Sequence, residues 1–329
     1  MTLGSTALVE SPLQLLGTVE AVHAGIVPSP VEVRWRAAVP GLRAAVQALT
    51  ALPLPPGLDL VPAGRASTRD LPRRARTYAV GDVFSGRAQA GLAVARPGRL
   101  VLLDDGLATH EAARLLGTSG APLVRVGQRV PAPRRALGTR TARRIRALAT
   151  DGRVTLFTAL PVALPGIDVV EHGFDWVASL PPAPVVPEAL VVVGSGLVAD
   201  GLVDPDAYVA WVAGLASGAS GAGGTCYVPH RRHDPAVLAR LAALPGVRVA
   251  PAGPPIELRL RSLTADQAVV CLPSTAYPLL RRVLARSGTR VELADVPSRW
   301  WTARAGARLR EHLVTTAGHD RAPGEGMGR

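Results

Sequence analysis

The chain has 329 residues, of which 48% are hydrophobic, and its 37 basic and 25 acidic side chains give a formal net charge of +12. So apolar a composition excludes an intrinsically disordered chain, and no apolar run approaches the ~20 residues that a membrane helix needs. Two cysteines, Cys226 and Cys271, are too few for a disulfide framework or a zinc site. With no signal-peptide pattern at the start, we expect a cytoplasmic protein.

The basic surplus consists entirely of arginine, because the sequence contains no lysine. It favours anionic ligands or an anionic membrane face through long-range attraction. Six of the arginines crowd one short segment: Arg134, Arg135, Arg140, Arg143, Arg144 and Arg146. The simplest interpretation is a solvated helix face. The alternative is a peripheral dock for anionic lipid, on the inner face of the cytoplasmic membrane, or for a polyanionic acceptor.

Short apolar runs alternate with helix-period segments along the first half of the chain. The predicted strands are residues 6–10, 31–35, 58–61, 77–80 and 99–103. The predicted helices are residues 11–24, 41–52, 85–95, 109–116 and 138–149. This alternation indicates an open parallel sheet with helices on both of its faces.

A proline-rich stretch at 181–187 interrupts the pattern and predicts a semi-rigid linker. Beyond it we expect strands at 189–193, 225–228, 247–250, 268–272 and 290–293, and helices at 205–216, 235–244 and 276–285. The prediction is an N-terminal domain over 1–180, a linker over 181–188, a C-terminal domain over 189–316 and a flexible tail over 317–329. Two Rossmann-like, doubly wound domains would face each other across a cleft, with ligands at the carboxyl ends of their strands.

Asp104 and Asp105 come directly after the predicted strand 99–103, and Gly106 after them permits a tight exit. Adjacent carboxylates at a strand end point in different directions, so one could face a ligand while the other braces the turn. The one that faces a ligand could act as a general base on a substrate hydroxyl. The alternative is a plain turn with a helix N-cap, because Thr109 and Glu111 follow.

The loop that holds His230 and Arg231 leaves one predicted strand and opens a helix, so its backbone amides already favour an anion. Both side chains add donors that suit a phosphate, and a protonated His230 could stabilise a departing phosphate. The alternatives are a solvated basic turn and a metal site. For a metal, His230 and His233 have only Asp234 beside them, so we favour a phosphate.

Three other strand-to-helix turns carry polar groups. Ser274 and Thr275 present hydroxyls that suit a phosphate or carboxylate, although either is also a good N-cap. Glu257 could accept both hydroxyls of a ribose, or be an ordinary acid in a first helical turn. Gly194 and Ser195 form a loop that suits close ligand approach. We find no P-loop, no dinucleotide fingerprint and no nucleophile elbow.

Two further turns complete an ordered set of motifs. Ser11 and Gln14 lie at the first strand–helix turn, and Asp82 follows the strand 77–80. From residue 10 to about residue 280 the set resembles the bacterial sialyltransferases of glycosyltransferase family fifty-two and the related alpha-2,8-polysialyltransferase family. In this chain Arg231 stands where the His motif of these families usually has proline.

The resemblance implies a glycosyltransferase B fold, a CMP-linked sialic or related nonulosonic acid as donor, and no metal or other cofactor. It implies an inverting transfer to a hydroxyl of a glycan or glycolipid. Asp104 or Asp105 would be the general base, with Asp104 preferred and Asp200 the alternative, and His230 would assist departure of CMP. The donor side would comprise Gly194, Ser195, Arg231, Glu257, Ser274 and Thr275, and the acceptor side Ser11, Gln14 and Asp82.

Two other classes of function stay open. One is a UDP-sugar-dependent glycosyltransferase or epimerase of similar fold. The other is a non-catalytic protein that binds anions or nucleic acid through the basic surplus. Against nucleic acid, aromatic residues make up only 4% of the chain, which is few for base-stacking platforms.

Overall fold

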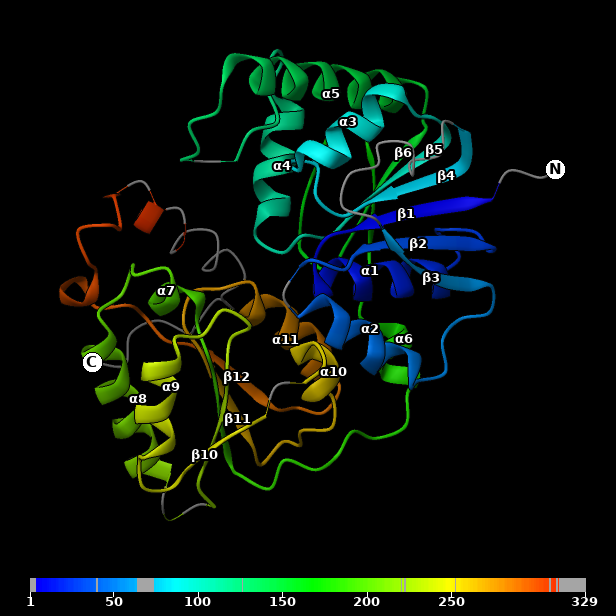
Figure 1. Cartoon of the computed structure of the whole chain (residues 1–329). Coiled ribbons are helices and arrows are strands. Elements are labelled where there is room, and N and C mark those ends of the chain that lie inside the picture. The colour runs from blue at the N-terminus through cyan, green and yellow to red at the C-terminus, as the bar shows by residue number, and fades with distance from the viewer. Residues whose placement is uncertain are drawn as a thin grey trace. The chain divides into compact units, whose positions relative to one another are not determined.

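The computed structural model describes residues 4–313 apart from 40, 64–73, 126, 220, 222, 252, 308 and 312. The predicted tail at 317–329 lies outside these residues. The chain divides into two compact units, Met1–Leu180 and Pro181–Arg329, called unit 1 and unit 2 below. Each is a parallel sheet covered by helices (Figure 1).

Unit 1 contains a seven-stranded parallel sheet in the order β3-β2-β1-β4-β5-β6-β7. Its strands are β1 (Ser5–Val9), β2 (Val31–Arg36), β3 (Leu58–Ala63), β4 (Arg74–Val80), β5 (Arg96–Leu103), β6 (Val154–Thr158) and β7 (Asp168–Glu171). Its helices are α1 (Pro12–His23), α2 (Leu42–Thr50), α3 (Gly86–Val94), α4 (Ala108–Gly117), α5 (Ala132–Thr150) and α6 (Asp175–Ser179). The chain runs outward from β1 to β3 and returns at β4, so the sheet's topological switch point lies between β1 and β4.

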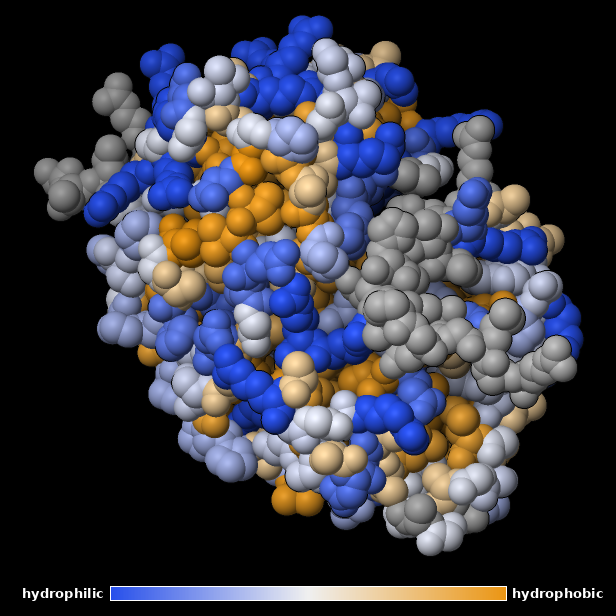
Figure 2. Space-filling model, turned by 180° about the vertical axis from the view of Figure 1, so that it is seen from behind, coloured by the Kyte–Doolittle hydropathy of each residue, from blue (hydrophilic) through white to orange (hydrophobic). Residues whose placement is uncertain are grey.

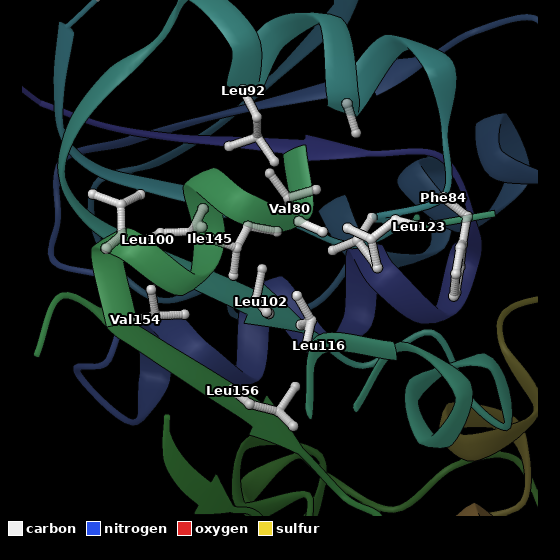
Figure 3. Packing of buried hydrophobic residues seen from close by; sticks show 14 of the residues in the cluster. Val80, Phe84, Leu92, Leu100, Leu102, Leu116, Leu123, Ile145, Val154 and Leu156 are labelled. Carbon is white, nitrogen blue, oxygen red and sulfur yellow. The ribbon is translucent and has the colours of Figure 1, made fainter. Parts of the chain in front are cut away.

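The core of unit 1 explains why its central strands are nearly all apolar. Every residue of β1 and β6 is buried, as expected for strands that have helices over both faces. On one face Leu100 and Leu102 of β5 pack with Leu92 of α3 and Ile145 of α5 (Figure 3). At roughly 1.5–3 kcal/mol per buried side chain, this cluster holds α3, α4 and α5 on the sheet.

Unit 2 contains a five-stranded parallel sheet in the order β10-β9-β8-β11-β12. Its strands are β8 (Leu190–Val193), β9 (Thr225–Val228), β10 (Val247–Val249), β11 (Ala268–Cys271) and β12 (Arg290–Leu293). Its helices are α7 (Gly196–Ala199), α8 (Pro205–Ala219), α9 (Pro235–Ala242), α10 (Ile256–Arg259), α11 (Ala276–Leu284) and the 3₁₀ helix η3 (Ser298–Trp300). Val191 and Val193 face the α11 side and Val192 the α8 side, so both faces carry a core.

The prediction of two doubly wound parallel sheets is confirmed for both units. The sequence interpretation was wrong between residues 150 and 180, where it missed β6, β7 and α6. Two threonines interrupt the apolar run of β6, and β7 is a short, half-exposed edge strand. The sequence interpretation also placed the start of α5 at residue 138. The helix begins at Ala132, because proline is tolerated in the first turn of a helix.

The arginine-rich segment lies on α5, and half of its arginines are structural. Arg146 donates to the carbonyl oxygens of Leu115 (2.8 Å) and Leu116 (2.9 Å), which end α4. Arg144 donates to the carbonyl of Ala95, and Arg134 to the carbonyl of Phe84 and to Gln89. Arg144 and Arg146 therefore satisfy carbonyls that helix C-termini leave open, Arg134 bonds groups at the start of α3, and the interpretation as a solvated face was wrong for all three. The three that are exposed are Arg135, Arg140 and Arg143.

The surface offers little else that would mark a membrane contact. Across the described residues, no helix is both long and apolar enough to cross a membrane. Seen from behind, hydrophobic residues gather in the upper half of the view among hydrophilic ones (Figure 2). Only three large hydrophobic residues among those described are well exposed, Val61, Val94 and Val185. Scattered exposed valines of this kind are ordinary, so the membrane dock stays a prediction.

A buried carboxylate joins the end of unit 1 to its beginning. Glu20 of α1 is 1% exposed and accepts from the backbone N–H groups of Trp176 and Val177, each at 3.0 Å. These amides open α6, whose N-cap Phe174 offers no side-chain bond. Burial raises the pKa of Glu20, and the two N–H donors oppose that rise. The carboxylate thus caps a helix that lies far away in the sequence.

We expect Glu20→Ala to lower the free energy of unfolding by about 2 kcal/mol or more, since two buried N–H groups lose their acceptor. Urea denaturation followed by circular dichroism measures the change. Glu32→Ala is the matched control, because the Glu32 side chain is 40% exposed and pairs with Arg34, a contact worth about 1 kcal/mol at most. Equal losses in the two variants would show that Glu20 does not hold α6.

Candidate functional site

The carboxyl ends of β1, β4 and β5 bring three of the predicted residues together. Ser11 caps α1 by accepting from the N–H of Gln14 (3.2 Å). The Gln14 side chain accepts from the N–H of Glu10 at Oε1 (2.7 Å) and donates from Nε2 to Asp105 Oδ1 (2.6 Å). Because Oε1 accepts and Nε2 donates, these two bonds fix the orientation of the amide.

Gly81 makes this arrangement possible, and the sequence interpretation gave it no role. A Cβ on Gly81 would lie 2.3 Å from Cγ and 2.4 Å from Cδ of Gln14. Gln14 is 2% exposed and both ends of its amide are hydrogen-bonded, so its side chain cannot move away from an added methyl group without losing these bonds. The missing side chain of Gly81 therefore leaves the space through which Gln14 reaches Asp105.

Arg125 links two of the predicted carboxylates. Its Nη2 donates to Asp82 Oδ2 (3.0 Å) and to Asp105 Oδ2 (2.7 Å). Its guanidinium also lies over the ring of Phe84, 5.3 Å from the centroid. Asp82 in turn accepts from the N–H of Phe84 at Oδ1 (2.8 Å). Sequence reasoning missed Arg125 because it lies in a segment without helix or strand, remote in sequence from both partners.

Asp104 occupies a different environment from its neighbour. It is 2% exposed, and Oδ1 accepts from the N–H of Gly106 (2.7 Å) and the hydroxyl of Thr109 (2.8 Å). Oδ2 accepts from the hydroxyl of Thr158 (2.9 Å) and the N–H of Ala159 (3.0 Å). Burial raises the pKa of Asp104 against these four donors. A carboxylate has about four acceptor positions, and here all four are used to brace the turn.

The turn after β5 differs in detail from the alternative that the sequence left open. Leu107 holds the N-cap position of α4 and makes no side-chain bond. Thr109 does not cap the helix, because its hydroxyl donates to Asp104 and accepts from the N–H of Asp105 (2.9 Å). Gly106 has a φ of 65°, the left-handed conformation that glycine permits.

Asp105 is poised to exchange a proton near neutral pH. Burial, followed by the nearby charge of Asp82, raises the pKa of Asp105 to about 6, against the lowering effect of Arg125. Its side chain keeps 17% of its surface exposed. Together with Asp82 and apolar side chains such as Leu116, it lines a pocket with about 330 Å³ of empty space, part of it open to solvent. A carboxyl group with this pKa can serve as a general base at neutral pH.

In unit 2, two glycines let the ends of β8 and β9 meet. The N–H of Gly194 donates to the carbonyl of Val228 (2.8 Å), and a Cβ on Gly194 would lie 2.6 Å from the backbone nitrogen of His230. A Cβ on Gly196 would lie 3.0 Å from the His230 ring. Ser195 between them caps α7 by accepting from the N–H of Leu197 (3.2 Å). The structure thus brings Gly194 and His230 together.

His230 is neutral at physiological pH. Its Nδ1 accepts from the N–H of Arg232 (3.2 Å), so the proton of the neutral ring belongs on Nε2. Burial, then the charges of Arg232 and Arg231, lower the pKa of His230 to about 4. Nε2 is therefore a neutral N–H donor in a basic setting, and an anion beside it would raise this pKa.

Asp200, the alternative base, is already engaged. Its two oxygens accept from Nη1 (2.6 Å) and Nη2 (3.0 Å) of Arg232 in a bidentate pair. The pair is exposed and lies beside the His230 loop. Asp200 therefore balances the charge of that loop, and both of its carboxylate oxygens are engaged by Arg232.

The remaining donor-side residues follow other strands of the same sheet. Glu257 is buried in α10, after β10. Ser274 and Thr275 follow β11 and are half-buried. Thr275 holds the N-cap position of α11 without a side-chain cap bond, so the alternative of a capping threonine is wrong. All these residues lie at the carboxyl edge of the sheet, which is where parallel sheets bind ligands.

No metal site emerges from the part of the chain that the structure describes. In that part, no three His, Cys, Asp or Glu residues gather in a way that could hold an ion. His233 turns its Nδ1 to the backbone carbonyl of His230 at 3.0 Å. Asp234 accepts from the N–H groups of Ala236 and Val237 as the N-cap of α9.

Comparison with known proteins gives structural likeness at low identity. No protein-family model matches this chain, and no curated protein matches it. Among solved structures it is similar to a UDP-glucosyltransferase from Polygonum tinctorium capable of glucosylating indoxyl, with 12% identity and a TM-score of 0.45 over 96% of this chain and 94% of that one. It is also similar to the E. coli heptosyltransferase WaaC with ADP, with 10% identity and a TM-score of 0.44 over 95% and 99% of the chains.

A third similar structure is the UDP-GlcNAc 2-epimerase from Methanocaldococcus jannaschii, with 10% identity and a TM-score of 0.46 over 95% of this chain and 91% of that one. Because all three TM-scores lie below 0.5, we draw no functional conclusion from these likenesses. The resemblance to the sialyltransferase families therefore stays a prediction.

We expect Gly81→Ala to destabilise unit 1 by about 1–3 kcal/mol, because the new methyl group displaces Gln14 and breaks its bond to Asp105. In a Gln14→Ala background the same change should cost much less, since the space is already free. Urea denaturation of the parent protein, the two single variants and the double variant measures this coupling. Gly117→Ala is the control, as nothing lies within 4 Å of its Cβ. Equal costs in both backgrounds would contradict the role given to Gly81.

Proposed function

We propose that the protein is an inverting glycosyltransferase of the glycosyltransferase B type. It transfers sialic acid, or a related nonulosonic acid, from a CMP-linked donor to a hydroxyl of a glycan or glycolipid. The observation that carries this proposal is Asp105, a largely buried carboxyl with a pKa of about 6, fixed at both oxygens and open to a pocket.

Asp105 suits the role of general base better than Asp104. Among the residues that the structure describes, Gln14 and Arg125 each use one acceptor position of Asp105, which leaves about two of its four positions for a substrate hydroxyl. Asp104 has all four positions filled and is nearly inaccessible. The sequence-based preference for Asp104 therefore gives way to Asp105.

The carboxyl edge of the unit 2 sheet supplies what a nucleotide phosphate needs. In the loop after β9, His230 offers a neutral Nε2–H donor beside two arginines. A singly charged phosphodiester, such as that of a CMP-linked sugar, fits a site in which basic side chains are partly balanced by Asp200. Glu257 is assigned to the ribose, and Ser274 and Thr275 to the phosphate or carboxylate.

The reaction follows from these two sets of residues. The bond between the anomeric carbon and the phosphate oxygen lengthens, and its electron pair leaves with CMP. As the anomeric carbon becomes electron-poor, the acceptor oxygen attacks it from the opposite face and passes its proton to Asp105. His230 and its neighbouring amides stabilise the charge that develops on the leaving phosphate. Attack opposite the leaving group inverts the anomeric configuration.

We expect calorimetric titration with EDTA present to show binding of CMP in preference to UMP and UDP. Substitution of His230 by alanine should weaken CMP binding about tenfold, since a charge-assisted bond worth about 1.4 kcal/mol or more is lost. Circular dichroism checks that the variant folds. Tighter uridine binding would move the protein to a UDP-sugar transferase or epimerase. The absence of nucleotide binding would contradict the proposal.

We expect Asp105→Asn to lower the rate of CMP release from CMP-sialic acid by about 10²–10⁴-fold while CMP affinity is unchanged, because the amide cannot accept the proton. Asp59→Asn, on the exposed side of β3, is the matched control and should behave as the parent protein. Asp104→Asn should lower the free energy of unfolding instead, because the amide NH₂ meets N–H and O–H donors. Full activity of Asp105→Asn would exclude it as the base.

We expect CMP to raise the pKa of His230 from its value of about 4. A bound phosphate offsets the arginine charges and favours the imidazolium, so proton uptake should accompany binding below about pH 6. Histidine NMR signals in the free and CMP-bound protein measure the shift. An unchanged His230 titration would place the phosphate elsewhere.

A further inference from the structure

Arg125 makes one contact pattern that the proposed chemistry has not used. A single nitrogen, Nη2, donates both to Asp105 Oδ2 (2.7 Å) and to Asp82 Oδ2 (3.0 Å). We propose that Arg125 is a positioning residue, which, anchored by Asp82, fixes Oδ2 of the base Asp105 and keeps that carboxyl ready to receive the substrate proton. The inference rests on the proposed function, in which Asp105 is the base.

The segment that carries Arg125 is held in place on unit 1. Leu123 is fully buried, and its carbonyl accepts from Gln89 Nε2 of α3 (2.9 Å). A Cβ on Gly138 would lie 2.8 Å from the same carbonyl, so only a glycine in α5 allows this approach. The guanidinium two residues further on lies over the Phe84 ring. Arg125 therefore has a defined position even though its segment is neither helix nor strand.

The charges that face Asp105 act in opposite directions. Asp82, from the turn after β4, raises the pKa of Asp105, and Arg125, from the segment after α4, lowers it. Gln14, from α1, is neutral and donates a hydrogen bond. Asp104, in the same turn, is buried and its oxygens are bonded to other donors. Asp82 and Arg125 are thus the two charged side chains through which the protonation of Asp105 can be changed.

Asp82 has two effects that must be separated. Its charge opposes ionisation of Asp105, but its carboxylate also holds the guanidinium that favours ionisation. Removing the charge while keeping the shape, as in Asp82→Asn, leaves an oxygen for Arg125 and removes the repulsion. Removing the guanidinium, as in Arg125→Gln, leaves two carboxylates facing each other. The two variants must therefore move the pKa of Asp105 in opposite directions.

The experiment measures the pKa of Asp105 in two ways. One is NMR titration of carboxyl carbons in aspartate-labelled protein, with the Asp105 signal identified by its loss in Asp105→Asn. The other is the acid limb of the pH profile of CMP release from CMP-sialic acid. We expect Arg125→Gln to raise both values by about one unit or more and Asp82→Asn to lower both. At pH 6 the rate of Arg125→Gln should fall about fivefold relative to the parent protein, because a one-unit rise in the pKa leaves only about a tenth of Asp105 ionised at pH 6. At pH 8 the rate should recover.

Two further variants keep the test decisive. Arg125→Lys retains the charge without the two-way donor geometry, so it should restore most of the pKa but not the full rate. Arg240→Gln is the control, since Arg240 pairs with the exposed Asp206 in unit 2 and should leave the titration unchanged.

Opposite shifts in Arg125→Gln and Asp82→Asn, seen in both measurements, support the proposal. Shifts of the same sign, or a rate loss in Arg125→Gln that is equal at every pH, overturn it in favour of a merely structural arginine. If the parent protein releases no CMP, the proposed function fails, and the carboxyl titration still decides whether Arg125 and Asp82 set the protonation of Asp105.

Discussion

The arrangement of unit 1 depends on keeping the carboxyl of Asp105 largely out of water without leaving it unpaired. A buried carboxylate is costly unless donors meet it, and here the donors come from two other segments of the chain. Gln14 reaches one oxygen from α1 through the space that Gly81 leaves, and Arg125 reaches the other. The pairing of β1 with β4 makes this possible, because it places the first turn of α1 beside the turn that follows β4.

The sequence predicts the position of this site better than its chemistry. Alternation of apolar runs and helical segments places Gln14, Asp82 and Asp105 after three strands, and parallel strands end at one edge. It does not say which of two adjacent aspartates turns inward. That depends on Thr158, the last residue of β6, and on Ala159 after it, and the pattern did not reveal this strand. Nor does it find Arg125, because a residue in an irregular segment carries no periodicity that links it to a distant strand end.

In unit 2, too, the sequence predicts a type of site but not the protonation state of its residues. A basic loop before a helix predicts an anion site, which stays a prediction, and Gly194 permits the close approach of two strand ends. The state of His230 follows only from its surroundings: Arg232 donates to its Nδ1 and, with Arg231, adds positive charge that holds the pKa low. In the proposed function, an anion that binds beside this histidine raises its pKa. Protonation and ligand binding at this loop are therefore linked.

Three buried carboxylates of unit 1 show why one is suited to chemistry and two are not. Glu20 and Asp104 accept from backbone N–H groups, with threonine hydroxyls added for Asp104, and these donors cannot leave without unfolding a turn or a helix end. The donors of Asp105 are side chains, a glutamine amide and a guanidinium, which can adjust as a proton arrives. The backbone donors fix the carboxyl groups of Glu20 and Asp104 as parts of the fold. The side-chain donors of Asp105, one of them balanced by Asp82, leave the pKa of its carboxyl at about 6. The difference between bracing a fold and moving a proton thus lies in which groups do the donating, together with the 17% of its side-chain surface that Asp105 keeps exposed.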